Sequence, residues 1–446
     1  MITADVATVR PATRLRGELR LPGDKSISHR ALILSALATG ESRITGAGDG
    51  ADVRSTAAIM RALGATVEVR PDDDGRNVAY RVASLGADGL REPDTILDCG
   101  NSGTSLRLIA GVLAGLPMTA ILDGDASLRR RPVARIIEPL RRMGAVIHGR
   151  RADSLPPLTV VGHTPLRGMD HTTPVPSAQV KSAILLAGLR AEGRTTVREH
   201  VATRDHTERM LRARGVPVER AEDGDAVVVA LEGGTAVQAI DQHVPADVSG
   251  AAFWLVAAAI HPDAELTLRD VGVNPTRRAI IDILRSMGAS IEERRVDDAV
   301  DPSVGEPIAD LVIRSSELRA VELGPADVAS AIDEIPVLCL AATQARGTTR
   351  IRGAGELRNK ESDRIAGIAA GLVALGAEIT VDGDDLVIPG GQRLRGGTAD
   401  SIGDHRLAMT FSVAGLIADD GVAVQRSGSA AVSYPGFFAD LEGVRA

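Results

Sequence analysis

Short polar turns, each placed beside an apolar helix-forming run, hold most of the residues that could do chemistry in this chain. The first turn, DKSISHR at residues 24–30, places Lys25, Ser26 and Arg30 before the run ALILSALATG. Free N–H groups at a helix start bind anions, and nearby cations add to the attraction. A serine in such a turn is equally typical of simple helix capping. The P-loop pattern is excluded, because Asp24 stands where that motif requires its last glycine.

Further turns repeat this mixture of cations, small polar residues and a few acids. They are GNSGTSLR with Gly103 and Arg107, RRRP with Arg131, PSAQVKS with Ser177, Gln179 and Lys181, ASAIDEIP with Asp333 and Glu334, RNKESDR with Lys360, Glu361 and Arg364, and GDHRLAM with Asp404, His405 and Arg406. Each turn alone is typical of a solvated helix end. Together they predict a cleft between two domains, lined by cations and a few carboxylates. Such a cleft suits a small polyanionic substrate and acid–base chemistry.

Six copies of one repeat must position these turns. Five copies have a small-residue apolar helix, a β-branched segment and a second helix with a one-sided apolar stripe, which predicts a buried helix, a strand and an outer helix, and the sixth copy is cut short. The second helix ends in a glycine suited to a left-handed helix stop. These glycines recur every 71 to 88 residues, at Gly64, Gly144, Gly215, Gly288 and Gly376. Six αβ repeats predict an α/β protein with two domains of three repeats each.

The expected domains are residues 24–243 and a second domain made of 1–23 together with 244–446. The boundary lies near IDQHVPADVSG, between the third and fourth repeats. The segment TRLRGELRLPG, residues 13–23, has no repeat of its own, and a strand there could complete the C-terminal domain.

Composition narrows the class of protein. The net charge is −8 and aromatic residues are 2% of the chain, which argues against a nucleic-acid binder. Cys99 and Cys339 occur in unrelated contexts, so neither a disulfide framework nor a cysteine metal cluster is expected. The longest apolar stretch, residues 251–260, is about half of a membrane span. We therefore expect a cytoplasmic protein that binds neither membranes nor nucleic acids. We further expect a monomer, although composition does not determine the oligomeric state.

The motifs LPGDKSISHRALILSALA, GNSGTSLR, RRRP, PSAQVKSAILLAGL, IDEIP, NKESDR and GDHRLAM resemble, in order and spacing, those of the 5-enolpyruvylshikimate-3-phosphate synthase family of enolpyruvyl transferases. The resemblance runs from about residue 15 to residue 440. It implies an inverse α/β barrel, with two domains of three βαβαββ units and a ligand cleft between them. The implied reaction transfers the enolpyruvyl group of phosphoenolpyruvate to the 5-hydroxyl of shikimate 3-phosphate and releases phosphate, in the shikimate pathway to the aromatic amino acids. The family uses no metal and no organic cofactor.

The resemblance also implies roles for individual residues. Shikimate 3-phosphate would contact Lys25, Ser26, Arg30, Ser177, Ala178, Gln179, Arg204, Asp333 and Lys360. Phosphoenolpyruvate would contact Lys25, Gly103, Arg131, Gln179, Arg364 and Arg406. For catalysis it implies Lys25, Asp333 as acceptor of the 5-hydroxyl proton, and Glu361 as the acid that protonates the methylene carbon. The product of that addition is a tetrahedral intermediate.

Two alternatives stay open at this stage. The sister transferase that acts on UDP-N-acetylglucosamine usually has a reactive cysteine before RP, whereas GDASLRRRP has none. A non-catalytic anion-binding relative would not require Asp333 and Glu361 beside anionic ligands.

Two further features concern the ligands: Val432 stands where many family members carry a lysine, and Gly103 is typical of enzymes sensitive to glyphosate, a mimic of phosphoenolpyruvate. The segments GDASLRRRP, RDHTE and NPTR instead resemble the glyphosate-tolerant subgroup.

Overall fold

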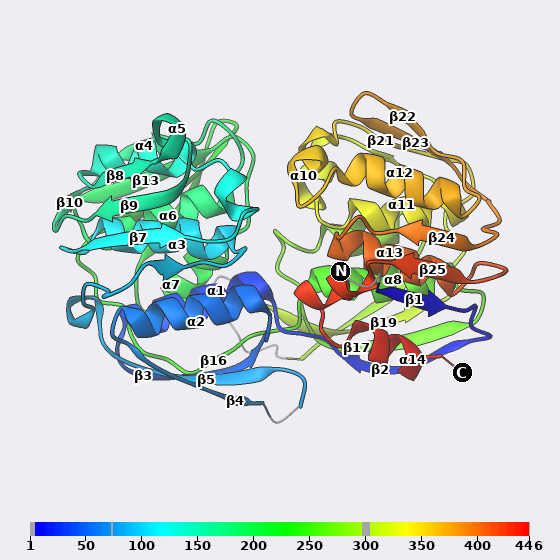
Figure 1. Ribbon diagram of the computed structural model, residues 1–446, viewed down its shortest axis with the longest axis horizontal. Coiled ribbons are helices and arrows are strands. Elements are labelled where there is room, and N and C mark those ends of the chain that lie inside the picture. The colour runs from blue at the N-terminus through cyan, green and yellow to red at the C-terminus, as the bar shows by residue number, and fades with distance from the viewer. Residues whose placement is uncertain (1–4, 73–74, 297–303, 446) are drawn as a thin grey trace. The chain divides into compact units, whose positions relative to one another are not determined.

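The computed structural model describes residues 5–72, 75–296 and 304–445, and the chain divides into two units (Figure 1). The first unit consists of Gly23–Pro245 and Ala299–Glu306, and the second of Met1–Pro22, Ala246–Asp298 and Pro307–Ala446. Each unit is built around its own hydrophobic core.

The first unit contains seven α-helices among the described residues, with two short 3₁₀ turns. The helices are α1 (Lys25–Leu37), α2 (Ala51–Ala62), α3 (Gly103–Ala114), α4 (Ala134–Met143), α5 (Arg150–Asp153), α6 (Ala178–Gly188) and α7 (His206–Ala213), and the turns are η1 (Ala87–Gly89) and η2 (Leu128–Arg130). Its strands are β3 (Thr39–Ala47), β4 (Thr66–Pro71), β5 (Val78–Leu85), β6 (Leu97–Asp98), β7 (Thr119–Asp123), β8 (Val146–Gly149), β9 (Leu155–Val161), β10 (Leu166–Arg167), β11 (Asp170–Thr172), β12 (Ala191–Glu192), β13 (Arg194–Glu199), β14 (Val218–Asp223), β15 (Ala226–Glu232) and β16 (Gln242–His243).

The second unit repeats this alternation of helices and strands. Its helices are α8 (Val248–Ile260), α9 (Ala279–Ser286), α10 (Pro325–Ser330), α11 (Ile335–Gln344), α12 (Arg364–Ala374), α13 (His405–Gly415) and α14 (Phe437–Gly443), with 3₁₀ turns η3 (Gly355–Asn359) and η4 (Ser427–Val432). Its strands are β1 (Val6–Val9), β2 (Leu15–Arg20), β17 (Ala264–Gly272), β18 (Ser290–Arg295), β19 (Ile308–Arg314), β20 (Glu322–Leu323), β21 (Thr348–Ile351), β22 (Thr380–Asp382), β23 (Asp385–Pro389), β24 (Gly397–Asp400) and β25 (Val422–Gln425).

One strand pattern recurs in six sheets of the described chain. A strand at one edge runs parallel to its neighbour, and that neighbour pairs antiparallel with the next strand. The strand orders are β16-β3-β5-β4, β6-β7-β9-β8 and β11-β13-β15-β14 in the first unit, and β2-β17-β19-β18, β20-β21-β23-β22 and β24-β25-β1 in the second. Six equivalent sheets confirm the prediction of six repeats.

Two edge strands come from distant parts of the chain. β16 follows the third repeat, yet it pairs in parallel with β3 of the first repeat. β2 precedes all the repeats, yet it pairs in parallel with β17 of the fourth, from Leu15 opposite Ala264 to Arg20 opposite Arg269. The N-terminal segment therefore supplies a strand to the second unit.

The first helix of each repeat is buried on nearly every side. Almost every residue of α1, α3, α6, α8, α11 and α13 is buried, as expected of helices that are apolar all round. Helices α3 and α6 approach each other closely, because a Cβ added to Gly111 would lie 2.3 Å from the carbonyl oxygen of Ala183. Gly111 therefore sets the spacing of the two helices whose N-terminal turns carry Gly103 and Gln179.

The glycine at the end of each second helix adopts the expected conformation. The φ angles are +102° at Gly64, +117° at Gly144, +78° at Gly215, +99° at Gly288 and +97° at Gly376. An L-residue with a side chain would be strained there, so glycine stops each helix and turns the chain into the next strand.

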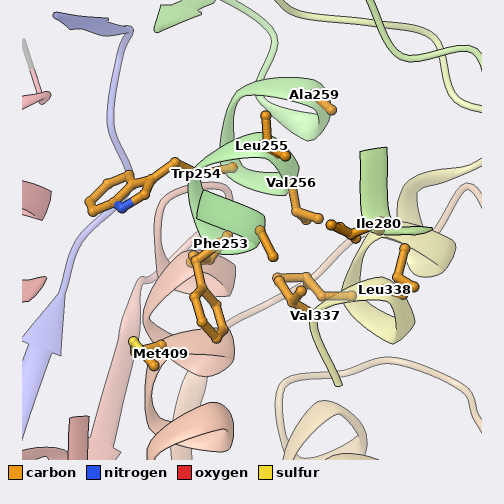
Figure 2. Packing of buried hydrophobic residues seen from close by; sticks show 14 of the residues in the cluster. Phe253, Trp254, Leu255, Val256, Ala259, Ile280, Val337, Leu338 and Met409 are labelled. Carbon is orange, nitrogen blue, oxygen red and sulfur yellow. The ribbon is translucent and has the colours of Figure 1, made fainter. Parts of the chain in front are cut away.

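Most of the few aromatic residues pack around α8 in the second unit. Trp254 is fully buried and its Nε1 donates to Tyr434 Oη at 3.2 Å, while Phe437 stacks edge-on against Tyr434 and Phe253. Figure 2 shows Phe253 directed toward Met409 of α13, and Val256 toward Ile280 of α9. These contacts tie α8 to its neighbours and to the C-terminal helix α14.

Among the described residues, no helix has the length and hydropathy required to span a bilayer.

A buried chain of three side chains joins α1, α2 and α3 in the first unit. The His29 Nδ1 lies 2.7 Å from Thr56 Oγ1, which in turn lies 2.7 Å from Ser105 Oγ. Burial lowers the pKa of His29 to about 3; the charge of Asp52 opposes this shift, and the smaller effects of Lys25 and Arg30 add to it. The folded protein therefore holds this imidazole neutral.

This buried histidine predicts a pH-dependent stability. Unfolding returns His29 to its ordinary pKa of 6.5. Between pH 6.5 and about pH 3, His29 is therefore protonated in the unfolded state and neutral in the folded state. The free energy of unfolding should fall as pH decreases from 6.5, by up to about 1.4 kcal/mol per pH unit from this residue. Urea unfolding at pH 7, 6 and 5 measures that slope. We expect a shallower slope for His29→Asn and no change for His163→Asn at an exposed position, and equal slopes in all three proteins would contradict the assignment.

Candidate active site

The start of α1 presents cations from a well-capped helix. Asp24 is the N-cap, and its Oδ1 accepts from Ile27 N at 2.9 Å. The expected serine cap is therefore wrong: the hydroxyl of Ser28 donates to the Asp24 carbonyl at 2.8 Å instead, because Asp24 already occupies the cap position. Lys25 follows as the first helical residue, and its Nζ lies 3.1 Å from Asp52 of α2. Ser26 is half-buried in the same turn.

Arg30 is a buried guanidinium with neutral hydrogen-bond partners. Its Nε donates to Thr207 Oγ1 at 2.7 Å, its Nη2 to Ser182 Oγ at 2.8 Å, and its Nη1 to the Ser26 carbonyl at 3.0 Å. Burial lowers the pKa of Arg30 to about 10, although the carboxylates of Glu208 and Asp24 act in the opposite direction. Arg204, in the segment between β13 and α7, is close enough for its charge to lower that pKa further. Arg30 therefore joins α1 to α6 and α7, and it stays cationic at neutral pH.

The N-terminal turns of α3 and α6 meet through Arg107 and Gln179. Ser177 caps α6 through Val180 N at 3.4 Å, and Ala178 begins the helix. The Gln179 Oε1 accepts from Arg107 Nη1 at 2.6 Å, and its Nε2 donates to Thr104 Oγ1 at 3.0 Å. This arrangement fixes the Gln179 amide between two helix starts.

The guanidinium groups of Arg107 and Arg131 lie near one another at the start of α3. Arg131 Nη2 donates to Asn101 Oδ1 at 2.6 Å, and a Cβ added to Gly103 would lie 2.7 Å from Arg107 Nη1 and 3.5 Å from Arg131 Nη1. Burial lowers the pKa of Arg107 to about 9, and the charges of Arg135 and Arg131 lower it further. Arg107 hydrogen-bonds to no carboxylate in the described part of the chain, so this concentration of cations is well suited to bind an anion.

The second unit places Arg364 at the centre of an acidic cluster. This guanidinium donates from Nε to Asp404 Oδ2 at 2.8 Å, from Nη2 to Glu361 Oε2 at 2.7 Å, and from Nη1 to Asp333 Oδ1 at 3.4 Å. Lys360 Nζ lies 3.9 Å from the same oxygen of Asp333. Burial acts to lower the pKa of Arg364, but the surrounding carboxylates outweigh it and raise that pKa above its usual value. Asp333 and Glu361 are thus held around one buried, permanently charged side chain.

Arg406 and Glu334 belong to a neighbouring network under α8. Arg406 Nη1 donates to the Ser249 carbonyl at 3.1 Å, while its buried Nε has no hydrogen-bond partner among the described residues. Glu334 is buried and accepts from Ser249 Oγ, and Arg277 Nη2 donates to the same hydroxyl at 2.6 Å. Glu334 thus has the hydrogen-bond donor that a buried carboxylate needs.

A cavity of about 190 Å³ in the first unit lies away from these residues. It is lined by residues at the C-terminal ends of the buried helices, among them Leu37, Leu116 and Leu189. The one arginine on its wall, Arg190, lies within hydrogen-bond distance of Asp88. Because this arginine already pairs with Asp88, the cavity suits an anionic substrate less well than the helix starts do, and the candidate site rests on the polar clusters.

Comparison with known proteins now adds an independent observation. Residues 9–441 match the family described as EPSP synthase (3-phosphoshikimate 1-carboxyvinyltransferase). The chain belongs to the EPSP synthase family. The 3-phosphoshikimate 1-carboxyvinyltransferase of Pelobacter propionicus is 48% identical over 441 residues, covering 98% of each chain, and that of Gloeobacter violaceus is 51% identical over 441 residues with the same coverage. The solved EPSP synthase of Acinetobacter baumannii is 39% identical, with a TM-score of 0.88 over 99% of this chain and 98% of that one.

Membership in the EPSP synthase family agrees with the predicted fold, the inverse α/β barrel. Within the first unit the structure brings together the helix starts that carry Lys25, Ser26, Arg30, Gly103, Ser177, Ala178 and Gln179, with Arg131 and Arg204 in adjoining segments. Within the second unit it brings together Asp333, Lys360, Glu361 and Arg364, and connects Arg406 to the adjacent turn through Ser249. Val432 ends η4 with 49% of its surface exposed.

Several residues that hold the candidate side chains in place were not singled out from the sequence. Thr207 and Ser182 anchor Arg30, Asp52 pairs with Lys25, and Ser249 connects Glu334 to Arg277. Asp404 and Arg107 stood in quoted motifs, but no role was assigned to them. Their partners lie tens to more than a hundred residues away in the sequence, so local spacing carries no signal for them.

Proposed function

We propose that this protein transfers the enolpyruvyl group of phosphoenolpyruvate to the 5-hydroxyl of shikimate 3-phosphate and releases phosphate. The observation that carries the proposal is the Arg364 cluster, in which Asp333 and Glu361 share one buried guanidinium. Addition of a hydroxyl across an enol double bond needs a base for the hydroxyl and an acid for the carbon. Two carboxylates fixed around an arginine supply that pair and the charge that stabilises an anionic intermediate.

We propose one set of binding residues for each substrate, and Lys25 and Gln179 belong to both sets. For shikimate 3-phosphate we propose Lys25, Ser26, Arg30, Ser177, Ala178, Gln179, Arg204, Asp333 and Lys360. For phosphoenolpyruvate we propose Lys25, Gly103, Arg131, Gln179, Arg364 and Arg406. Guanidinium groups match carboxylate and phosphate oxygens in pairs, which favours arginine at these positions. The domains are proposed to be residues 24–243 and residues 1–23 with 244–446, in a cytoplasmic monomer.

The proposed reaction has two steps. Asp333 accepts the proton of the 5-hydroxyl while Glu361 protonates the methylene carbon, which forms the new C–O bond and the tetrahedral intermediate. Lys25, Arg131 and Arg364 offset its negative charge. Glu361, now a carboxylate, then takes a proton back from the new methyl group as phosphate departs, which restores the double bond. A ligand anion that pairs with Arg364 competes with Glu361 for the guanidinium, so binding of phosphoenolpyruvate frees the acid for its task.

Phosphate release tests the proposed function. The protein is mixed with phosphoenolpyruvate and shikimate 3-phosphate, and free phosphate and the enolpyruvyl product are measured over time. We expect release only when both substrates are present. Release with UDP-N-acetylglucosamine in place of shikimate 3-phosphate would favour the sister transferase. Ligand binding without release would favour a non-catalytic relative.

A methyl group at position 103 should weaken binding of phosphoenolpyruvate and of its mimic glyphosate. In the Gly103→Ala variant the new Cβ would meet Arg107 Nη1 at 2.7 Å, so this flexible guanidinium must shift away from Gln179. We expect a KM for phosphoenolpyruvate raised about tenfold, as for one lost hydrogen bond to a charged group, and a larger rise in the inhibition constant of glyphosate. Gly443→Ala is the matched control, since nothing lies within 4 Å of its added Cβ. Unchanged inhibition in Gly103→Ala would remove this explanation.

A further inference from the structure

A buried ionic cluster lies directly behind the Arg30 side chain in the first unit. Lys181 of α6 places its Nζ 2.8 Å from Glu199 Oε2 and 2.7 Å from Glu208 Oε1. The three side chains are at most 2% exposed. Burying three charges is costly, and apolar residues of the same size would often be as stable. The cluster is therefore expected to serve a purpose beyond stability. None of the three belongs to the substrate contacts proposed above.

The charges of this cluster balance the charge of Arg30. Two carboxylates face one ammonium, which leaves one negative charge, while Arg30 hydrogen-bonds only to Thr207, Ser182 and the Ser26 carbonyl among its described partners. Neither oxygen of Glu208 has a hydrogen-bond partner in the described chain beyond the ion pair with Lys181. Glu208 is thus near enough to attract Arg30 without occupying its donors. A phosphate group can then reach Arg30 without displacing a carboxylate.

The same cluster fixes the segment that carries Arg204. The Thr203 hydroxyl donates to Glu199 Oε1, and the Thr203 N–H to Glu199 Oε2 at 3.5 Å. Lys181 Nζ lies 3.4 Å from the Thr203 carbonyl. Both backbone polar groups of Thr203 are therefore held, and the next residue in the chain is Arg204.

The cluster also connects the helices that hold Arg30. Ser182 follows Lys181 in α6, and Thr207 precedes Glu208 in α7; their hydroxyls lie 2.7 Å from one another and both accept from Arg30. Any displacement of Lys181 relative to Glu208 would therefore move both acceptors of Arg30.

We propose that Lys181, Glu199 and Glu208 form a positioning triad for the sugar-phosphate end of the site, which holds Arg30 and Arg204 in place for the phosphate of shikimate 3-phosphate. The inference rests on the proposed function, which assigns Arg30 and Arg204 to that ligand. The described contacts of the triad go to Thr203 and to the helix positions beside Ser182 and Thr207, the partners of Arg30, whereas we propose Gly103 and Arg131 for the other substrate. Its loss should therefore affect one substrate selectively.

Thr203→Val and Glu208→Gln test the triad. The first removes one hydroxyl and the second one charge, each with little change in shape. We expect the KM for shikimate 3-phosphate to rise about tenfold in each, with the KM for phosphoenolpyruvate and kcat within about twofold of the wild type. Thr203→Ser keeps the hydroxyl and should restore the wild-type KM. Thr66→Val, at an exposed position in β4, is the matched control and should change neither constant.

The outcomes separate the triad from a purely structural cluster. Unchanged KM values in folded Thr203→Val and Glu208→Gln, with an active wild type, would overturn the triad alone. Equal rises in both KM values, or a loss of kcat alone, would also overturn it, because the effect would not be confined to the sugar phosphate. A wild-type protein without phosphate release would overturn the proposed function and this inference with it. Thermal unfolding of each variant shows that the kinetic comparison is made on folded protein.

Discussion

We expect the Glu361→Gln variant to fold as the wild type does and to lose about 10²- to 10⁴-fold in kcat, the usual range for removal of a general acid. Glutamine has the shape of glutamate, and its carbonyl oxygen can still accept from Arg364 Nη2, which lies 2.7 Å from Glu361 Oε2. What the variant lacks is the proton for the methylene carbon. Initial rates of phosphate release at saturating substrates measure the loss.

The companion variant Asp333→Asn removes the base in the same way and should show a loss of similar size. Both carboxylates are partly exposed, so neither substitution should disturb the core. Glu356→Gln, at an exposed position in η3 of the same unit, is the matched control and should retain the wild-type rate. Wild-type rates in both Glu361→Gln and Asp333→Asn would remove the assigned acid and base.

Local patterns in the sequence were enough to predict the repeated architecture. Glycine is the residue that ends a helix in the left-handed conformation, so Gly64, Gly144, Gly215, Gly288 and Gly376 could be identified as helix ends, and all have positive φ. The apolar residues around α8 and α1 predicted buried helices because no polar face was available to meet water. These features depend on neighbouring residues alone.

Local sequence patterns could not predict features that depend on partners far away in the sequence. The sequence of α7 predicts an outer helix with Arg and Glu toward solvent, yet His206, Glu208 and Arg209 are buried. That prediction was wrong because the partner of Glu208 is Lys181 on another helix, and no spacing within α7 reveals it. The pairing of β16 with β3, which makes β16 the edge strand of the first sheet, was not predicted for the same reason.

In the candidate site, too, local features could be predicted from the sequence and features that depend on distant partners could not. Lys25, Arg30, Gly103 and Gln179 could be identified because each lies at a helix start, where charge and free N–H groups bind anions. The cap of α1 was misjudged, since aspartate and serine are both good caps and only the structure shows which one occupies the position. The role of Asp404 needed the structure as well, because its partner Arg364 lies 40 residues away.

The largest combined effect on stability and binding is expected for Arg364→Gln. This substitution leaves Asp404, which is fully buried, without the guanidinium that lies 2.8 Å from its Oδ2. Breaking a buried ion pair in this way costs about 3–5 kcal/mol in the free energy of unfolding. The KM for phosphoenolpyruvate should rise at least about tenfold, since a charge-assisted pair to the ligand is lost too. Urea unfolding and initial rates measure the two effects.

A double-mutant cycle with Asp404→Asn separates the ion pair from the ligand contact. If Arg364 and Asp404 stabilise each other, the double variant should lose less stability than the sum of the two single variants, because neither is left with an unpaired buried charge. Binding of phosphoenolpyruvate should not recover with it, because Arg364 is still absent. Arg393→Gln is the matched control: its exposed pair with Asp419 at 2.8 Å should cost less than about 1 kcal/mol. Additive stabilities, or an unchanged KM in Arg364→Gln, would show that Arg364 plays neither part.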